Sequence, residues 1–295
     1  MNLCNIKTVK ALLSRYSTDT KKGFGQNFLI NPSVPFDIAE ESFGYHSSVC
    51  RDSACVLEIG PGVGALTSEL CQRYDKVVAV EIDRSLIPVL GETMAEYDNF
   101  TLVNEDFLKL KLDSFLNEHF GDAPVSVCAN LPYYITTPIL MKLLEDGNSR
   151  FASITVMVQK EVAMRLCASE KDSDYGAITA SVNYYGRVKR LFDVQPSSFL
   201  PAPSVTSTVI RIELYKDKPY SVLNEKTLFE VIAGAFAQRR KTLLNSLSSS
   251  ISYIPKARIG ELITECGFDI NIRGERLSIS DFCTLANKIY EEKTK

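Results

Sequence analysis

The 295-residue sequence contains no tryptophan, only two histidines and no apolar run that approaches the length of a membrane span. A helix needs about 20 mostly apolar residues to cross a bilayer. The N-terminal region also lacks the apolar core and the small-residue cleavage site of a signal peptide. We therefore expect a cytoplasmic protein that does not contact a membrane.

Metal and nucleophile motifs are missing as well. His46 and His119 have no second ligand at metal spacing and no nucleophile motif beside them, which argues against zinc hydrolases and against serine or cysteine triads. The eight cysteines contain no CxxC pair, so we expect them to be reduced thiols. We expect no bound metal.

Length and charge indicate a globular protein of two domains with an uneven charge distribution. Residues 1–180 carry 16 Lys+Arg against 24 Asp+Glu, and residues 181–295 carry 17 against 12, so the two parts have net charges of -8 and +5. Three basic clusters stand out: Lys21-Lys22, Arg187/Lys189/Arg190 and Arg239-Arg240-Lys241. Because phosphates bind where basic side chains gather, these clusters suggest contact with a nucleic acid, although solvated surface charge is the alternative for any one of them.

From residue 55 onward, apolar strand-like runs alternate with helical patterns. The expected strands are 55–59, 76–81, 100–103, 125–129 and 154–158, and the expected helices are 65–74, 85–94, 138–144 and 160–166. This alternation predicts an α/β fold, with a mostly parallel sheet covered by helices on both faces.

The pattern changes in the last third of the chain. Two β-rich runs, 188–194 and 206–213, predict an antiparallel pair that closes the sheet. After residues 216–219 only helical patterns follow, at 227–238, 241–247, 257–266 and 281–291. We therefore predict two domains, a Rossmann-like domain over residues 1–215 and a small helical domain over residues 216–295.

Candidate binding residues follow the first three strands of the predicted sheet. Gly60, Gly62 and Gly64 lie between a strand and a helix, Glu81 ends the next strand, and Asp106 follows the third. Glycines let the backbone approach a ligand, and a carboxylate at the position of Glu81 can accept hydrogen bonds from ribose hydroxyls. Asp106 could accept the amino group of an adenine. The alternatives are a tight connection for the glycines and solvated strand ends or helix caps for the acids.

The form of the glycine turn distinguishes two adenosine-containing cofactors. A GxGxG turn with an internal proline, preceded by Glu58, is the form seen in S-adenosylmethionine enzymes, whereas dinucleotide enzymes have GxGxxG. The turn therefore favours S-adenosylmethionine.

The tetrapeptide Asn130-Leu131-Pro132-Tyr133 follows the fourth strand and comes to the same sheet edge. An amino group on a nucleobase is a poor nucleophile, because its lone pair is delocalised into the ring. The Asn130 side chain and the Leu131 carbonyl could accept its two hydrogens and hold it near a methyl donor. Pro132 would stiffen the turn, and Tyr133 could stack on an extruded base. A plain turn with a packed tyrosine is the alternative.

With these residues in place, the sequence resembles the bacterial small-subunit ribosomal RNA adenine dimethyltransferases, the family of the kasugamycin-sensitivity enzyme. The resemblance runs along nearly the whole chain. It rests on KKGFGQNFL at 21–29, LEIGPGVGALT at 57–67, VEID at 80–83, NEDFL at 104–108, NLPYYITTPIL at 130–140, MVQKEVAMRL at 157–166, FLPAPSVTSTVIRI at 199–212 and FAQRRKTLLNSL at 236–247.

The resemblance implies a role for each matching residue. The segment over residues 1–30 closes over S-adenosylmethionine, which Asn27, Leu29, Gly60, Gly62, Glu81, Asp106 and Asn130 contact. Asn130, Leu131, Pro132, Tyr133 and Phe199 form the catalytic region, with Tyr133 and Phe199 stacking on the two faces of the target adenine. By itself, Phe199 is more typical of core packing.

The resemblance further implies that the chain dimethylates N6 of two adjacent adenosines in the 3′-terminal hairpin loop of 16S rRNA. The partner would be the 30S subunit or its precursor, and the chain would act as a monomer. The helical domain, including Arg239-Arg240-Lys241, would contact the RNA, although a packed helix with its charges in water explains that cluster equally well.

Three other functions remain open from the sequence. A large-subunit rRNA adenine methyltransferase of the macrolide-resistance type shares the fold and the cofactor, but FLPAPSV and FAQRRKTLLNSL favour the small-subunit enzyme. A ribosome assembly factor with secondary methylation is the second. A nicotinamide dehydrogenase is the third, and it lacks a catalytic His, Lys or Tyr in a hydride-transfer context.

Overall fold

The computed structural model describes residues 1–18, 25–50, 53–147, 150–170 and 172–295. Lys21 and Lys22, and the start of the KKGFGQNFL motif, lie outside the described residues. The chain divides into two compact units, one formed by Met1–Ala163 with Val188–Leu214 and the other by Met164–Arg187 with Tyr215–Lys295. Over the described ranges, no helix combines the length and apolar character that a membrane span requires.

The first unit is built on a seven-stranded sheet with the strand order β4-β3-β2-β5-β6-β9-β7. Its strands are β2 (Cys55–Ile59), β3 (Lys76–Val80), β4 (Phe100–Val103), β5 (Val125–Asn130), β6 (Phe151–Gln159), β7 (Gly186–Val194) and β9 (Ser207–Leu214). In this order, strands β4, β3, β2, β5 and β6 each pair in parallel with their neighbours, and β9 pairs antiparallel with β6. The predicted fold class is confirmed, with all five predicted parallel strands in place.

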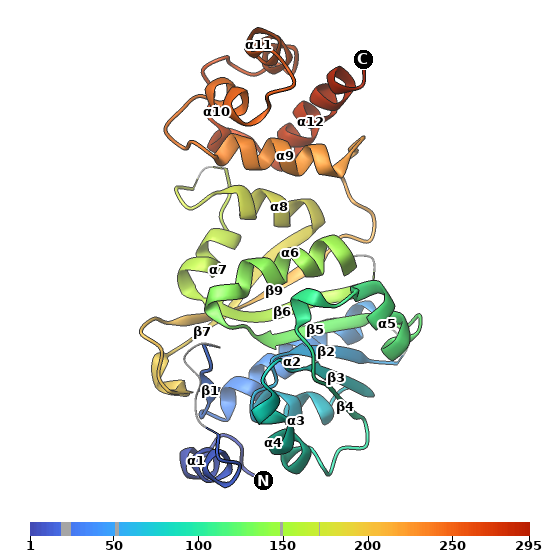
Figure 1. Cartoon of the computed structure of the whole chain (residues 1–295), viewed down its shortest axis with the longest axis vertical. Helices are drawn as coiled ribbons and strands as arrows, with labels where there is room; N and C mark the ends of the chain where they lie inside the picture. Colours follow the sequence, from blue (N-terminus) through green and yellow to red (C-terminus); the bar gives the residue numbers. More distant parts are fainter. Residues whose placement is uncertain (19–24, 51–52, 148–149, 171) are drawn as a thin grey trace. The chain divides into compact units, whose positions relative to one another are not determined.

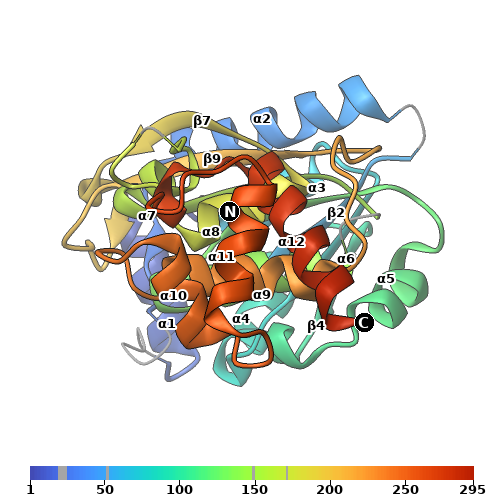
Figure 2. The ribbon, with the colours of Figure 1, turned by 90° about the horizontal axis from the view of Figure 1, so that it is seen from above.

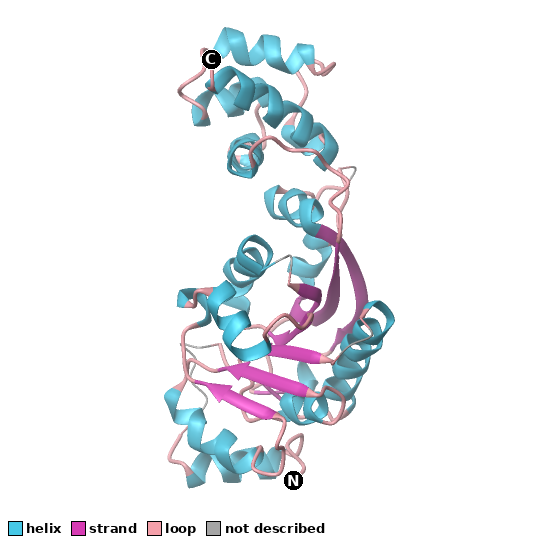
Figure 3. Ribbon diagram, turned by 90° about the vertical axis from the view of Figure 1, so that its right-hand side faces the viewer, coloured by secondary structure: helices cyan, strands magenta, loops and turns pink. Residues whose placement is uncertain are grey.

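Helices cover both faces of this sheet (Figure 3). They are α2 (Ser33–Val49), α3 (Ala65–Cys71), α4 (Ile87–Thr93), α5 (Leu112–Phe120) and α6 (Thr136–Gly147). Helix α7 (Lys160–Leu166) begins in this unit directly after β6, and its last three residues belong to the second unit. Figure 2 shows α2 on one side of the strands and α6 on the other. Because both faces are covered, the central strands are largely buried, and β2 is buried at every residue, Glu58 included.

The predicted helices differ from the structure by one to three residues at their ends, except the one predicted at 160–166, which matches α7. The helix expected at 85–94 is a 3-10 turn, η2 (Arg84–Leu86), followed by α4, because Pro88 occupies the first turn of α4. The helix expected at 65–74 ends earlier, at Cys71. Helices α1 (Ile6–Arg15), α2, α5 and α8 (Ala177–Tyr185) were not predicted from the sequence.

A short two-stranded sheet brings the N-terminal region to the main sheet's carboxyl edge. Strand β1 (Phe28–Leu29) pairs antiparallel with β8 (Phe199–Leu200), with Leu29 opposite Phe199. Phe28, Leu29 and Phe199 are buried in the same hydrophobic core. The pairing therefore fixes residues 25–27, which directly precede β1, near the carboxyl edge of the main sheet.

The second unit is helical (Figure 1). Its helices are α8, α9 (Glu225–Phe236), α10 (Leu243–Ser250), α11 (Lys256–Glu265) and α12 (Ile279–Lys293). The sequence prediction placed a single boundary near residue 215 and did not anticipate that Met164–Arg187 joins this unit. Tyr175 shows why, since its ring packs edge-on against Phe236 and its hydroxyl donates to the Leu277 carbonyl at 3.0 Å.

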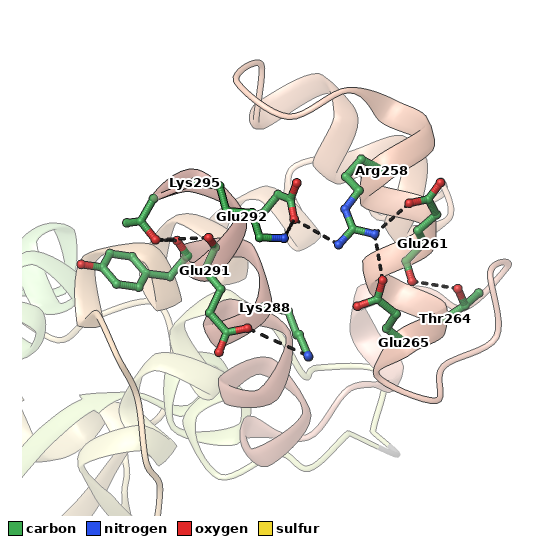
Figure 4. Close-up of polar contacts among 10 residues, drawn as sticks. Arg258, Glu261, Thr264, Glu265, Lys288, Glu291, Glu292 and Lys295 are labelled. Carbon is green, nitrogen blue, oxygen red and sulfur yellow. Dashed lines mark hydrogen bonds and ion pairs between the residues drawn. The ribbon is translucent and has the colours of Figure 1, made fainter.

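Ion pairs and a tight backbone contact hold the C-terminal helices together. The Arg258 guanidinium of α11 donates to Glu261 and Glu265 of the same helix and to Glu292 of α12 (Figure 4). Gly274 approaches α9 so closely that a Cβ there would lie 2.8 Å from the Ala235 carbonyl oxygen. A larger residue at position 274 would therefore separate these segments.

Candidate active site

A cavity opens at the carboxyl edge of the sheet, where β2, β3 and β5 end. It encloses about 1070 Å³ of empty space, a volume that includes open solvent. Most of the site residues predicted from the sequence line this cavity, namely Asn27, Leu29, Gly60, Gly62, Glu81, Asp106, Asn130, Leu131, Pro132 and Tyr133. The structure therefore brings together residues that come from five separate segments of the chain.

The glycine turn between β2 and α3 forms one wall. Gly60 and Gly62 have φ values of +69° and +63°, a conformation that side chains other than glycine rarely adopt. A Cβ at Gly60 would meet no atom within 4 Å, whereas one at Gly62 would lie 3.2 Å from the Phe28 ring. At Gly60 the backbone itself therefore borders open space, as close approach of a ligand requires.

Glu81 connects the end of β3 to this turn. Its side chain accepts hydrogen bonds from the backbone N–H of Asp83 at 2.8 Å and of Gly62 at 3.4 Å. Burial raises the pKa of Glu81 to about 7, while these N–H groups favour the ionised form. The carboxyl group is 4% exposed and lines the cavity, so a ligand hydroxyl that reaches it would find an acceptor held in place on both sides.

Glu58 lies deeper, on β2, and also lines the cavity. Burial raises its pKa to about 8. Within the part of the chain that the structure describes, its Oε2 atom has no hydrogen-bond partner. At neutral pH the protonated form of Glu58 is therefore favoured, and one polar atom remains unsatisfied at the base of the cavity.

Asp106 starts the 3-10 turn η3 (Phe107–Lys109) after β4, and its Oδ1 accepts the backbone N–H of Leu108 at 3.0 Å. The side chains of Leu108 and Ile82 are exposed apolar groups that line the same cavity. Sequence reasoning missed these two residues. In the sequence, each of the two could have been recognised as an apolar residue one or two positions after a strand-end acid. A planar aromatic group could lie between the side chains of Ile82 and Leu108.

The Asn130-Tyr133 turn forms the opposite wall. The Asn130 amide nitrogen donates to the Asn27 carbonyl oxygen at 3.1 Å. Because only the nitrogen of the amide can donate to a carbonyl, this contact also fixes the direction of Oδ1. Among the hydrogen bonds of the described residues, none reaches Asn130 Oδ1 or the Leu131 carbonyl oxygen. Two acceptors are thus available side by side.

Hydrogen bonds keep this turn in shape. The Leu131 N–H donates to the Met157 carbonyl of β6 at 3.2 Å. The Pro132 carbonyl accepts both the Ile135 N–H and the Thr136 hydroxyl, each at 3.2 Å. The acceptors at Asn130 and Leu131 are therefore carried by a turn that is already organised without a ligand.

Tyr133 and Tyr134 extend the wall outward. The Tyr133 hydroxyl lies 2.7 Å from Ser207 Oγ at the start of β9, and burial raises the pKa of Tyr133. Tyr134, which sequence reasoning missed, is 59% exposed and also lines the cavity. Its signal was the second tyrosine of the NLPYY motif.

Gly64, a candidate from the glycine turn, does not line the cavity, and among the residues to which the resemblance gives a role, Phe199 does not line it either. Phe199 shows why. Its side chain is 2% exposed and lies in the hydrophobic core, because β8 pairs with β1 through Leu29 and Phe199. In this arrangement its ring has no free face for a base. The role of Phe199 in base stacking stays a prediction that requires this packing to open.

The N-terminal segment lies against both walls. Gln26 Nε2 donates to Asp83 Oδ2 at 2.8 Å, and a Cβ at Gly25 would lie 3.3 Å from the Tyr134 ring. Together with the Asn27 contact to Asn130, these interactions join residues 25–27 to the ends of β3 and β5. Sequence reasoning missed Gln26, which had appeared only within the KKGFGQNFL motif.

No group of His, Cys, Asp or Glu side chains suited to hold a metal ion occurs within the described ranges. The site as described is built from carboxylates, amides, backbone groups and aromatic rings. This set suits hydrogen bonding and stacking with a nucleoside.

Known proteins match this chain along nearly its full length. Residues 17–291 match the family described as ribosomal RNA adenine dimethylase. A protein of Alkaliphilus oremlandii named ribosomal RNA small subunit methyltransferase A is 42% identical over 96% of both chains. A protein of the same name from Lachnoclostridium phytofermentans is 46% identical, also over 96% of both chains.

Two solved structures share the fold. A dimethyladenosine transferase from Plasmodium falciparum superposes with a TM-score of 0.71 at 24% identity, covering 90% of this chain and 98% of that one. The 23S rRNA methyltransferase ErmE superposes with a TM-score of 0.65 at 23% identity, covering 90% of this chain and all of that one (100%). At these identities the two structures establish similarity of the fold alone.

Proposed function

The chain belongs to the ribosomal RNA adenine dimethylase family, and from this premise we propose that it methylates N6 of two adjacent adenosines in the 3′-terminal hairpin loop of 16S rRNA. The methyl donor is S-adenosylmethionine, and the products are N6,N6-dimethyladenosines. One observation carries the proposal: the glycine turn, Glu81 and the Asn130-Tyr133 turn line a single cavity.

The residues of the cavity fit S-adenosylmethionine. Gly60 leaves open space where a side chain would stand, and the buried carboxyl of Glu81 can accept the ribose hydroxyls. Asp106, with Ile82 and Leu108 beside it, suits the amino group and the faces of an adenine. When bound, the cofactor supplies a methyl group on a sulfonium sulfur.

Asn130 and Leu131 prepare the attacking amine. Asn130 Oδ1 and the Leu131 carbonyl can each accept one hydrogen of the adenine amino group, which withdraws its lone pair from the ring and turns it toward the methyl group. The Asn27 carbonyl holds the Asn130 amide in the required orientation. No ionisable general base is needed near this nitrogen.

Tyr133 binds the target base. Its hydroxyl is held by Ser207, so the ring is already ordered before the base arrives. Stacking on an extruded adenine then costs little additional side-chain entropy. A hairpin loop is a suitable target because its bases are already partly unstacked. Asn27 and Leu29 act from the N-terminal segment, which closes over the cofactor.

The proposal extends to the setting of the reaction. The chain acts as a monomer in the cytoplasm on a 30S subunit or its precursor, and no metal takes part. The second unit contacts the rRNA. Two curated relatives named ribosomal RNA small subunit methyltransferase A support the choice of the small subunit.

Modification mapping distinguishes this function from the alternatives. The protein is incubated with labelled donor and either unmethylated 30S particles or 50S particles, and the modified nucleotides are mapped. Label at two adjacent adenosines of the 3′-terminal 16S loop is the expected result. Label in 50S particles indicates an enzyme of the macrolide-resistance type, and tight 30S binding without transfer indicates an assembly factor.

A further inference from the structure

Two basic side chains share one carboxylate beside the turn that holds Tyr133. Asp193 Oδ2 accepts hydrogen bonds from Lys160 Nζ at 2.8 Å and from Arg190 at 2.7 Å, while its Oδ1 accepts the Thr208 hydroxyl at 2.7 Å. The Lys160 ammonium holds the pKa of Asp193 well below its usual range, with the Thr208 and Arg190 hydrogen bonds adding to the effect. Lys160 and Arg190 therefore surround the Asp193 carboxylate, which stays ionised at neutral pH.

This arrangement leaves positive charge facing solvent. The side chains of Lys160 and Arg190 are 47% and 44% exposed, whereas that of Asp193 is 22% exposed. The carboxylate thus holds the two cations close together and neutralises only one of them. An anion with several oxygens, such as a phosphodiester, can accept hydrogen bonds from both.

The strand register places this group next to the proposed base-binding residue. Gln159 at the end of β6 lies opposite Ser207 of β9, and the Lys160 N–H donates to the Thr206 carbonyl at 3.0 Å. Ser207 in turn contacts the Tyr133 hydroxyl at 2.7 Å. Lys160 and Tyr133 therefore flank the same short stretch at the start of β9.

We propose that Lys160 and Arg190 form a phosphate-binding site that holds the RNA backbone next to the adenosine to be methylated. This inference rests on the proposed function. An extruded base that stacks on Tyr133 carries its own phosphodiester linkages beside it, and contacts to phosphates fix the position of a nucleic acid without reading its sequence. The two cations would determine where the loop lies, and Tyr133 would receive the base.

The salt dependence of binding tests for the phosphate contacts. Each phosphate contact to single-stranded RNA contributes about 0.7 to the slope of log K against log salt concentration. We expect Lys160→Gln and Arg190→Gln each to reduce the slope for unmethylated 30S particles by about this amount, measured at fixed magnesium between about 50 and 200 mM salt. Lys160→Arg keeps the charge and should keep the slope.

Two matched variants separate this site from general charge and from a structural role. Lys76 begins β3 at the opposite edge of the sheet, so Lys76→Gln should keep the wild-type slope. Asp193→Asn removes the negative charge and leaves both cations, while the amide oxygen can still accept a hydrogen bond from one of them, so RNA binding should be at least as tight as in the wild type. Weaker binding by Asp193→Asn, or the same slope change with Lys76→Gln, would overturn the proposal.

Location and kinetics complete the test. Ethylation of the phosphates next to the two target adenosines should interfere with binding of the wild type and not with that of the Lys160→Gln/Arg190→Gln variant. The same variant should show a higher KM for 30S particles with an unchanged dissociation constant for S-adenosylmethionine. Interference by phosphate ethylation that persists in the variant would contradict the proposed phosphate site. Failure of the wild type to methylate 30S particles would instead contradict the proposed function.

Discussion

The Asn130 amide nitrogen donates a hydrogen bond to the carbonyl oxygen of Asn27, which lies 103 positions earlier in the chain. One end of this contact belongs to the turn after β5, and the other to the segment that precedes β1. The orientation of Asn130 Oδ1 therefore depends on the N-terminal segment being in place. If the segment closes over the cofactor as proposed, this hydrogen bond would couple its closure to the preparation of the amine.

Replacement of Asn130 should affect chemistry far more than cofactor binding. Asn130→Ala removes one of two acceptors for the adenine amino group, and loss of one preorganised hydrogen-bonding group in a transition state costs about 10²- to 10³-fold in rate. Single-turnover methylation of 30S particles measures the rate, and calorimetry measures the cofactor dissociation constant. Asn271→Ala, on an exposed turn of the second unit, is the matched control. Unchanged turnover would remove Asn130 from the mechanism.

Glu81 should make cofactor binding depend on pH. Ribose hydroxyls donate better to the ionised carboxylate, and burial raises the pKa of Glu81 to about 7. As the pH falls below about 7, the ionised fraction decreases, and the dissociation constant of S-adenosylmethionine should rise by up to about tenfold per pH unit. Above that pH it should level off.

The variant Glu81→Gln isolates this effect. It should weaken cofactor binding by about tenfold or more at high pH, because hydrogen bonds to a charged group are lost, and it should remove the dependence on pH around neutrality. Titration calorimetry across the pH range measures both. A wild-type dissociation constant in the variant would contradict the ribose assignment.

The sequence predicted the parallel sheet and brought several of the cavity residues together for one physical reason. In a parallel sheet the carboxyl ends of neighbouring strands meet at one edge, so residues directly after each apolar run, such as Gly60, Glu81 and Asn130, had to come together. The period of the apolar residues fixed the strands, and the strands fixed the site.

Contacts between short or distant segments could not be predicted in this way. Strand β1 has two residues, too few to show any periodicity, and its partner β8 comes much later in the chain. The burial of Phe199 and the contact of Tyr133 with Ser207 follow from such pairings. Helix α8 was missed because its buried side chains pack against α9 and α12, which the sequence assigned to a separate domain.

The Tyr133 ring should contribute to base capture in two separable ways. Tyr133→Ala should weaken binding of 30S particles by about 1 to 3 kcal/mol if the ring stacks on a base. Tyr133→Phe keeps the ring and loses the contact with Ser207, so its effect should be smaller and appear mainly in the KM for RNA.

A double-mutant cycle tests the role of Ser207. If the hydrogen bond orients the ring, then Tyr133→Phe, Ser207→Ala and the double variant should share one KM for 30S particles, because each removes the same interaction. Steady-state methylation measures it. Additive effects of the two single changes would show that the hydroxyl groups act independently.

Glu58 should make the stability of the fold fall as the pH rises. Burial raises its pKa from the usual 4.5 to about 8, so the folded state holds a proton that the unfolded chain releases above about pH 4.5. Below about pH 4.5 Glu58 is protonated in both the folded and the unfolded chain, and the folded state keeps its full stability. That stability decreases as the pH rises toward about 8, because the unfolded chain has already released the proton that the folded state still holds. In this window the free energy of unfolding should fall by up to about 1.4 kcal/mol per pH unit. Glu81 contributes a similar effect up to about pH 7.

The comparison of Glu58→Gln with the wild type isolates the contribution of Glu58. The amide keeps the neutral shape without a titrating proton, so the variant should be less sensitive to pH, most clearly as the pH approaches about 8, where Glu81 is mostly ionised. Urea unfolding across the pH range measures the difference. Glu118→Gln, on the exposed face of α5, should keep the wild-type slope. If the free energy of unfolding depended on pH with the same slope in the wild type and in Glu58→Gln, then Glu58 would be ionised in the folded protein, with a partner other than those in this cavity.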